Sequence, residues 1–270
     1  MQRLAIKFAY DGRKFHGYAR QPGLKTVEGT IIETLLNLDL IPNIKKSIFR
    51  SASRTDKGVS AIGNVIAFNT MLSSNSINND IKNENILQKI SDELKFIYIY
   101  GIKTVDPYFN PRHAKLRQYR YYLPKNNIDI DVIKSAIKLF IGKHDFSNFA
   151  RIEAHRNPVR QINKIILKSE KNFLMIDFYA QNFLWHQIRR IISSIKQVGQ
   201  GILKESQIAE ALQNPDKKID FGLAAAEPLL LVDVNYDFKF HYNPDLLNRA
   251  YALEENIKKN LLHHQKKIIN

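Results

Sequence analysis

The sequence predicts an α+β fold in which mostly antiparallel sheets are built in two domains. The first observation is that apolar residues alternate in several short segments, as in strands, while other segments repeat them every three to four residues, as in helices. The second is that these segments follow one another with short connections, which favours antiparallel sheets over a doubly wound parallel sheet. The third is the length of 270 residues, for which two domains are slightly favoured over one.

In the first half, Leu4, Ile6, Phe8 and Tyr10 share one face of an expected half-buried strand. Thr26 is the expected N-cap of the helix that follows. Further elements are expected as strands at about 44–50, 60–69 and 96–102, an exposed loop at 73–79 and a helix at about 83–91. The order strand, helix, strand, strand, helix, strand is a ferredoxin-like arrangement.

Two prolines in the segment 105–111 mark the expected junction between a domain of residues 1–105 and a domain of residues 106–270. The second half shows a similar mixture of patterns. The expected elements are strands at 118–123, 162–168, 173–179 and 229–236, helices at about 130–140, 185–198 and 205–213, and a C-terminal helix with a basic tail. The fold class is therefore expected to be two ferredoxin-like-derived domains whose sheets meet at a central basic cleft.

Charge is the largest compositional signal, because 41 Lys and Arg stand against 26 Asp and Glu, a net charge of +15. Such an excess attracts polyanions, so nucleic acid is the leading class of partner, with a generic basic surface as the alternative. The chain has no cysteine, which excludes disulfides, thiolate metal sites and a cysteine nucleophile. No apolar run resembles a secretory signal or a membrane span. We expect a soluble cytoplasmic protein.

Common cofactor motifs are missing or incomplete. The pair Gly199 and Gly201 lacks the third glycine of a dinucleotide fingerprint, and Asn64 stands where a P-loop needs lysine. The 8 histidines show no convincing ligand spacing. A dehydrogenase, an NTPase and a zinc enzyme are disfavoured, and we expect neither a cofactor nor a metal.

The positive signal is the run Arg54-Thr55-Asp56, which lies between two expected strands and is followed by Gly58. A loop between strands can hold a functional carboxylate rigidly. On spacing alone, a turn with solvated charges is the favoured interpretation of these residues.

This run resembles the signature of the TruA-type tRNA pseudouridine synthases, and the resemblance continues along most of the chain. The other blocks similar to the family, in the same order, are residues 9–12, 15–17, 20–22, 26–29, 110–114, 117–121, 142–149, 158–162, 183–190 and 224–229. A chance match to one block is easy, whereas a chance match to the whole series is not. The resemblance implies an isomerase that converts uridine into pseudouridine in the anticodon stem-loop of tRNA, just 3′ of the anticodon, and that acts as a homodimer.

The resemblance also implies roles for individual residues. Asp56 is the expected catalytic aspartate, as a nucleophile or as a base that removes a proton from the ribose. Arg189 is expected to pair with it and keep the carboxylate ionised. Tyr119 is expected to stack on the target base and assist proton transfer, and Leu229 to close the base pocket. Read without the family, these side chains would be a basic helix face, a strand aromatic and a core leucine.

Three further residues are expected to bind the RNA. Arg54 is expected to hold the flipped nucleotide, and Arg20 and Gln21 to contact the backbone. The chain departs from the usual family pattern at three positions: Lys57, Ser60 and Pro228. These departures concern the shape of the loop and the choice of uridine.

Two rival hypotheses stay open on the sequence alone. One is a non-catalytic RNA-binding or RNA-folding protein on the same scaffold. The other is a carboxylate-dependent hydrolase of nucleic acid, which would need a second carboxylate near Asp56. Within the synthase hypothesis, a related subgroup modifies other tRNA stems or other RNAs.

Overall fold

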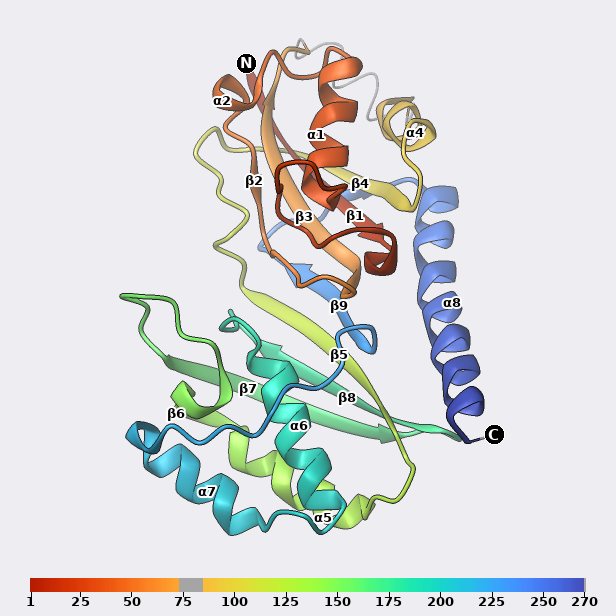
Figure 1. Ribbon diagram of the computed structural model, residues 1–270. Helices are drawn as coiled ribbons and strands as arrows, with labels where there is room; N and C mark the ends of the chain where they lie inside the picture. Colours follow the sequence, from red (N-terminus) through yellow and green to blue (C-terminus); the bar gives the residue numbers. More distant parts are fainter. Residues whose placement is uncertain (73–84, 270) are drawn as a thin grey trace. The chain divides into compact units, whose positions relative to one another are not determined.

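The computed structural model describes residues 1–72 and 85–269, which form two compact units (Figure 1). Unit 1 consists of Met1–Lys115 with Leu230–Asn270, and unit 2 of Leu116–Leu229. The bounds of these units differ from the expected division at residue 105, because the C-terminal segment packs with the N-terminal one. The domains 1–105 and 106–270 stay a prediction. The expected loop at 73–79 and the first residues of the expected helix at 83–91 lie outside the described residues.

Unit 1 is built on a mixed, mostly antiparallel sheet with the strand order β10-β4-β1-β3-β9. The long strand β1 (Gln2–Tyr10) lies between β3 (Ser60–Thr70) and β4 (Ile97–Val105) and is antiparallel to both. The start of β3 pairs in parallel with β9 (Leu229–Asn235), and β10 (His241–Tyr242) pairs with the outer side of β4. The strands expected at the start of the chain, at 60–69 and at 96–102 are confirmed as β1, β3 and β4.

The helices of unit 1 pack on this sheet. The first, α1 (Val27–Asn37), begins where expected, since Thr26 Oγ1 accepts a hydrogen bond from the N–H of Gly29 at 3.2 Å. The helix α4 (Asn85–Asp92) packs on β4, and the long α8 (Pro244–Ile269) packs on β4, β1 and β3. Leu246, Ala250, Leu253 and Ile257 are the residues that α8 buries.

β1 differs from the half-buried strand that its alternation predicts, because both of its faces are buried. The charged residues on the second face are satisfied by partners from distant segments. Lys7 forms an ion pair with Asp233, and Arg3 Nε donates to the carbonyl oxygen of Phe109 at 2.7 Å. A buried charge persists only when it is paired in this way. The sequence pattern identified the strand, but not the segments that cover its polar face.

The segment 44–50, expected to be a strand, is mostly not one. It forms the short helix α2 (Ile44–Ser47) and contributes only Arg50 to the two-residue strand β2 (Arg50–Ser51). The reason is a local cap, because Asn43 Oδ1 accepts a hydrogen bond from the N–H of Lys46 at 2.8 Å. Such a cap stabilises a helical turn in a segment that was too short for its periodicity to decide.

Unit 2 is built on an antiparallel sheet with the order β5-β8-β7-β6. Its strands are β5 (Leu116–Pro124), β8 (Phe173–Ala180), β7 (Val159–Ser169) and the short β6 (Gly142–Asp145). The expected strands at 118–123, 162–168 and 173–179 are confirmed to within three residues at each end. The strand β6 was not expected, because its four residues show no alternating apolar pattern.

Helices α5 (Ile130–Ala136) and α6 (Gln187–Gly199) of unit 2 pack against each other, and α7 (Glu205–Gln213) follows α6 in the chain (Figure 1). The expected helix at 130–140 is confirmed as α5 plus the 3-10 turn η2 (Ile137–Phe140). Helix α6 buries Ile188, Ile191, Ile192, Ile195 and Val198, the spacing of one helix face. In the described part of the chain, no helix is both long and apolar enough to cross a membrane.

Candidate active site

Asp56 lies in a loop between β2 and β3, and we call residues 52–59 the aspartate loop. The loop is anchored where it leaves β2. The N–H of Ala52 donates to the carbonyl of Val65 at 2.8 Å, and Asn64 Nδ2 donates to the carbonyl of Ser53 at 3.0 Å. Because Asn64 is fully buried, its amide acts inside the core of unit 1 and fixes the path of the loop above it.

The middle of the aspartate loop is held through Thr55, the neighbour of Asp56. The N–H of Tyr18 donates to the carbonyl of Thr55 at 3.3 Å. The hydroxyls of Tyr10 and Thr55 are 2.8 Å apart, in hydrogen-bond contact. Both tyrosine side chains are buried, so they form a rigid support, while Asp56 itself is half-buried. The arrangement gives a carboxylate with restricted solvent on a fixed backbone.

The end of the aspartate loop is a tight turn. The N–H of Val59 donates to the carbonyl of Asp56 at 3.2 Å, and Gly58 adopts a φ of +87°, which glycine tolerates better than other residues. Gly12 packs on this turn, and its N–H donates to Ser60 Oγ at 3.0 Å. A Cβ at Gly12 would overlap the carbonyl group of Val59, so glycine is required there by close approach rather than by its φ angle.

The other predicted site residues of unit 1 lie on or beside this loop. Arg54 is in the loop and exposed. Arg20 and Gln21 are also exposed; the N–H of Arg20 donates to Glu28 Oε2 at 3.1 Å, and Gln21 Nε2 donates to the carbonyl of His16 at 3.1 Å. Their segment adjoins the aspartate loop, because Tyr18, two residues before Arg20, donates its N–H to the carbonyl of Thr55. Unit 1 therefore groups one carboxylate with exposed basic and amide side chains.

In unit 2, Arg189 lies in the first turns of α6 and faces the segment 220–229, which we call the strap. Its Nε donates to the carbonyl of Ala224 at 2.8 Å, and the N–H of Ala224 donates back to the carbonyl of Arg189 at 3.2 Å. One turn along α6, Ser193 Oγ donates to the carbonyl of Phe221 at 2.7 Å. The strap therefore runs along the helix and orients the half-buried guanidinium.

Tyr119 and Tyr121 share one face of β5, as the alternation of the strand requires. Tyr119 is half-buried and its ring meets the ring of Phe183 edge to face at 5.3 Å. The Tyr121 hydroxyl is buried and donates to the carbonyl of Ala225 at 3.3 Å. Burial raises the pKa of Tyr121 well above the usual range of a phenol, and the positive charge of Arg189 acts in the opposite direction. The Tyr121 phenol and the Arg189 guanidinium are therefore electrostatic neighbours.

Leu229 ends the strap and is buried. Its N–H donates to the carbonyl of Ala226 at 2.9 Å, and the N–H of Tyr122 on β5 donates to the carbonyl of Pro228 at 3.1 Å. The strap thus connects α6 with β5, so the three predicted residues of unit 2 lie on adjoining segments. The pairing of Asp56 with Arg189 joins residues of different units and stays a prediction.

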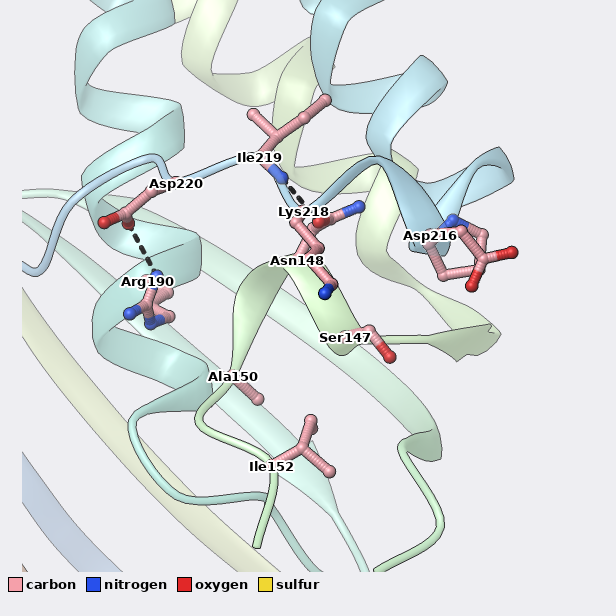
Figure 2. Close-up of a pocket in the computed structure, with 10 residues that line it drawn as sticks. Ser147, Asn148, Ala150, Ile152, Arg190, Asp216, Lys218, Ile219 and Asp220 are labelled. Carbon is pink, nitrogen blue, oxygen red and sulfur yellow. Dashed lines mark hydrogen bonds and ion pairs between the residues drawn. The ribbon is translucent and has the colours of Figure 1, made fainter. Parts of the chain in front are cut away.

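A hollow of about 420 Å³ lies elsewhere in unit 2 (Figure 2). Arg190 Nη1 and Asp220 Oδ1 form an ion pair there at 2.7 Å, and the N–H of Ile219 donates to Asn148 Oδ1 at 2.8 Å. The predicted site residues do not line it. The hollow shows how differently two adjacent arginines of α6 are used, since Arg190 anchors the start of the strap while Arg189 bonds to its middle.

The chain matches known proteins over nearly its whole length. A family model described as tRNA pseudouridine synthase matches residues 136–237. The tRNA pseudouridine synthase A of Thermococcus sibiricus is 41% identical over 271 residues, which cover 99% of this chain and 95% of that protein. The chain belongs to the tRNA pseudouridine synthase A family. Family membership makes it a tRNA-modifying isomerase.

Two further relatives also match over most of their length. The tRNA pseudouridine synthase A of Pyrococcus furiosus is 40% identical over 87% of this chain and 84% of its own length. The protein of that name from Methanosarcina barkeri is 33% identical over 97% of this chain and 94% of its own length. A chain in a structure titled "Structure of H/ACA RNP bound to a substrate RNA containing 2'-deoxyuridine" is 12% identical with a TM-score of 0.35, over 72% of this chain and 43% of that one. A likeness that distant adds nothing to the assignment.

In the synthase, the sequence missed the residues that support the aspartate loop: Tyr10, Gly12, Tyr18 and Asn64. Two of them lie in the block 9–12, but nothing local signals that they contact a loop more than forty residues away.

Within residues 1–72 and 85–269, His, Asp and Glu form no group of three that could hold a metal ion.

Proposed function

We propose that the synthase isomerises uridine to pseudouridine at positions 38, 39 and/or 40 of tRNA, in the anticodon stem-loop. In this reaction the bond between N1 and C1′ breaks and a bond between C5 and C1′ forms. The proton lost from C5 balances the one gained at N1, so no electron is transferred and the proposal includes no cofactor. The observation that carries the proposal is the half-buried carboxylate of Asp56 on a loop anchored at both ends, in a chain that matches synthases over nearly its full length.

Asp56 is proposed as the catalytic residue that starts cleavage of the glycosidic bond. It would either attack the sugar or remove a proton from the ribose, and both roles need an ionised carboxylate. Arg189 is proposed to keep it ionised, because a guanidinium beside a carboxylate favours the charged form. The bond from Arg189 Nε to Ala224 supports this role, since it limits the orientations that the guanidinium can take.

Tyr119 is proposed to stack on the uracil and to assist the proton transfer at C5. Its half-buried ring, held by the edge-to-face contact with Phe183, suits a stacking surface of defined orientation. Leu229 is proposed to close the base pocket through apolar contact. The hydrogen bonds of the strap on either side of Leu229 would keep its position constant.

Arg54, Arg20 and Gln21 are proposed to hold the RNA. A uridine in a stacked stem or loop must be turned out of the stack at a cost of a few kcal/mol, and Arg54 in the aspartate loop would keep the extruded nucleotide in place. Arg20 and Gln21, both exposed beside the loop, would contact the backbone.

The remaining parts of the proposal concern architecture and rest on the family resemblance. We infer two ferredoxin-like-derived domains, 1–105 and 106–270, whose sheets meet at a basic cleft, and a cytoplasmic homodimer that binds the anticodon arm of tRNA. Sedimentation equilibrium at micromolar concentration tests the dimer, because a mass of one chain at all concentrations would contradict it.

The catalytic proposal is tested with Asp56→Ala, Asp56→Asn and the wild type on an unmodified tRNA transcript. Single-turnover reactions without added cofactor are mapped for pseudouridine by carbodiimide adducts and primer extension. Both variants should bind the transcript and form pseudouridine at least about 1,000-fold more slowly. Glu93→Ala, which removes an exposed carboxylate of the same unit, should react at the wild-type rate.

Two results would contradict the proposal. If the wild type binds tRNA tightly and forms no pseudouridine in any transcript, the RNA-binding rival replaces it. If the wild type releases free base or cuts the RNA strand, the hydrolase hypothesis replaces the proposal.

A further inference from the structure

Three exposed lysines gather around two phenylalanine rings at one edge of unit 1. The Nζ atoms of Lys14 and Lys95 lie 5.3 and 5.4 Å from the centre of the same ring, that of Phe96. Lys25 Nζ lies 5.5 Å from the centre of the Phe15 ring. We call Lys14, Lys25 and Lys95 the lysine cluster. The cluster was not among the residues expected to bind RNA.

Backbone hydrogen bonds join the three segments that supply these lysines. The N–H of Asp11 donates to the carbonyl of Phe96 at 3.1 Å, and the N–H of His16 donates to the carbonyl of Lys25 at 2.9 Å. Phe96 has a φ of +69°, an uncommon conformation for a bulky residue that the surrounding contacts must impose. The three lysines therefore start from joined backbone segments, and the ammonium groups of Lys14 and Lys95 share the ring of Phe96.

No carboxylate neutralises the lysine cluster in the part of the chain that the structure describes. Asp11, three residues before Lys14, already receives two hydrogen bonds from Arg13, from Nε at 2.8 Å and from Nη2 at 2.7 Å, and Glu93, two residues before Lys95, is exposed. The face of an aromatic ring attracts a cation, but two ammonium groups on one ring still repel each other. An anion bound between them would remove that repulsion, as phosphate groups of a nucleic acid do.

The lysine cluster is connected to the aspartate loop. The turn η1 (Gly12–Lys14) ends at Lys14, and Gly12 is packed so closely on Val59 that a Cβ would not fit. The N–H of Gly12 also donates to Ser60 Oγ. A phosphate held by the cluster would therefore have a defined position relative to the loop that holds Asp56.

We propose that the lysine cluster binds the phosphate backbone of the substrate tRNA and thereby orients it on unit 1. The proposal rests on the proposed function for the identity of the RNA, and it adds a contact surface besides Arg20 and Gln21. The cluster would act through affinity and orientation and not touch the reacting atoms.

The test compares two double variants of unit 1. One removes two positive charges from the lysine cluster, and the other removes two from exposed lysines outside it. Lys14→Gln/Lys95→Gln is compared with Lys45→Gln/Lys46→Gln, whose exposed lysines lie on α2 of the same unit. The control lies at the opposite end of β3 from the cluster. Ile48, which follows α2, accepts a hydrogen bond from Arg3, and Arg3 pairs with Asn69 near the end of β3. The cluster adjoins Ser60, where β3 begins. Both pairs are placed in the Asp56→Ala background, so that tRNA binding is measured without turnover. Equal thermal midpoints exclude misfolding.

The cluster variant should bind an unmodified tRNA transcript at least about five-fold more weakly near physiological salt, and the slope of log Kobs against log salt should fall by about one to two units. In the control variant, the loss of affinity and the fall in the salt slope should each be less than half as large. Equal losses in the two variants, or unchanged binding by the cluster variant, would overturn the proposal.

The result is separable from the proposed function. If the wild type forms no pseudouridine but its tRNA affinity depends on the cluster, the catalytic proposal fails and this one stands. If the wild type forms pseudouridine and the cluster variant binds tRNA as tightly as the Asp56→Ala protein does, only the proposal for the lysine cluster fails.

Discussion

The aspartate loop and the helix that bears Arg189 are stabilised in different ways. The aspartate loop lies largely outside the regular strands, and single hydrogen bonds from Tyr10, Tyr18 and Asn64 hold it in place. Arg189 projects from α6, whose isoleucines are buried in the core of unit 2, and its Nε is fixed by the strap. Polar contacts therefore set the position of Asp56, while core packing sets the position of Arg189.

This difference separates two kinds of damage. A change that removes a polar support of the loop should alter the rate of the reaction while most of the unfolding free energy remains. A change within the guanidinium of Arg189 should alter the rate while the helix stays in place, because the packing residues are not touched. Substitutions of the two kinds should therefore differ in how strongly they change the reaction rate and the unfolding free energy.

Arg189→Ala should slow single-turnover pseudouridine formation by about 100-fold or more, because it removes the charge proposed to stabilise the ionised carboxylate. The free energy of unfolding should fall by only about 1 kcal/mol, from loss of the hydrogen bond to Ala224. Arg189→Lys should recover part of the rate, since it restores the charge without the planar fork of the guanidinium. Rates are measured at saturating enzyme, and stability by urea unfolding.

The matched control is Arg190→Ala on the same helix. Arg190 pairs with Asp220, whose side chain is 72% exposed, so its loss should cost less than about 1 kcal/mol and leave the rate nearly unchanged. A wild-type rate for Arg189→Ala, or an equal loss for both variants, would show that Arg189 has no special part in the reaction.

Gly12→Ala should damage the aspartate loop from its other side. The added methyl group would meet the carbonyl of Val59, so backbone must move, which destabilises by about 2–3 kcal/mol. Because Val59 closes the turn that begins at Asp56, the rate should fall as well. Thermal unfolding and single-turnover rates measure the two effects.

Gly23→Ala is the control for this substitution. Gly23 has a φ of +71° and nothing within 4 Å of an added Cβ, so alanine there costs only the left-handed conformation, about 1–2 kcal/mol. Its rate should stay close to that of the wild type. If Gly12→Ala reacted as fast as Gly23→Ala, the Gly12 contact would not position Asp56.

The sequence predicted what local periodicity determines and missed what depends on distant partners. β1 was expected because Leu4, Ile6 and Phe8 alternate, but its second buried face depends on Asp233 and Phe109, far along the chain. Segment 44–50 was too short for its pattern to outweigh the Asn43 cap. The longer elements α1, α6 and α7 were predicted close to their observed bounds, because each is long enough to show a periodic pattern. The short strands β6 and β10 are not, and they were not expected.

The candidate site divides along the same line. The run Arg54-Thr55-Asp56 is visible in the sequence because its residues are contiguous, and family resemblance supplied Tyr119, Arg189 and Leu229. The supports of the loop were not predictable, since Tyr10 and Asn64 look like ordinary strand residues until the fold brings them to Thr55 and Ser53. The lysine cluster was hidden likewise, because its members come from three separate segments.

Tyr10→Phe is the mildest test of the comparison. It removes only the hydroxyl that contacts Thr55 Oγ1 and should cost about 1 kcal/mol of unfolding free energy. Tyr100→Phe is its control, because that buried hydroxyl donates to the carbonyl of Ile62 at 2.8 Å in the same unit, so the loss of stability should be similar. If hydrogen bonds to the loop set the position of Asp56, only Tyr10→Phe should slow single-turnover chemistry, by several-fold, with tRNA affinity unchanged. Equal rates for the two variants would mean that the other supports of the loop hold Asp56 without the hydroxyl of Tyr10.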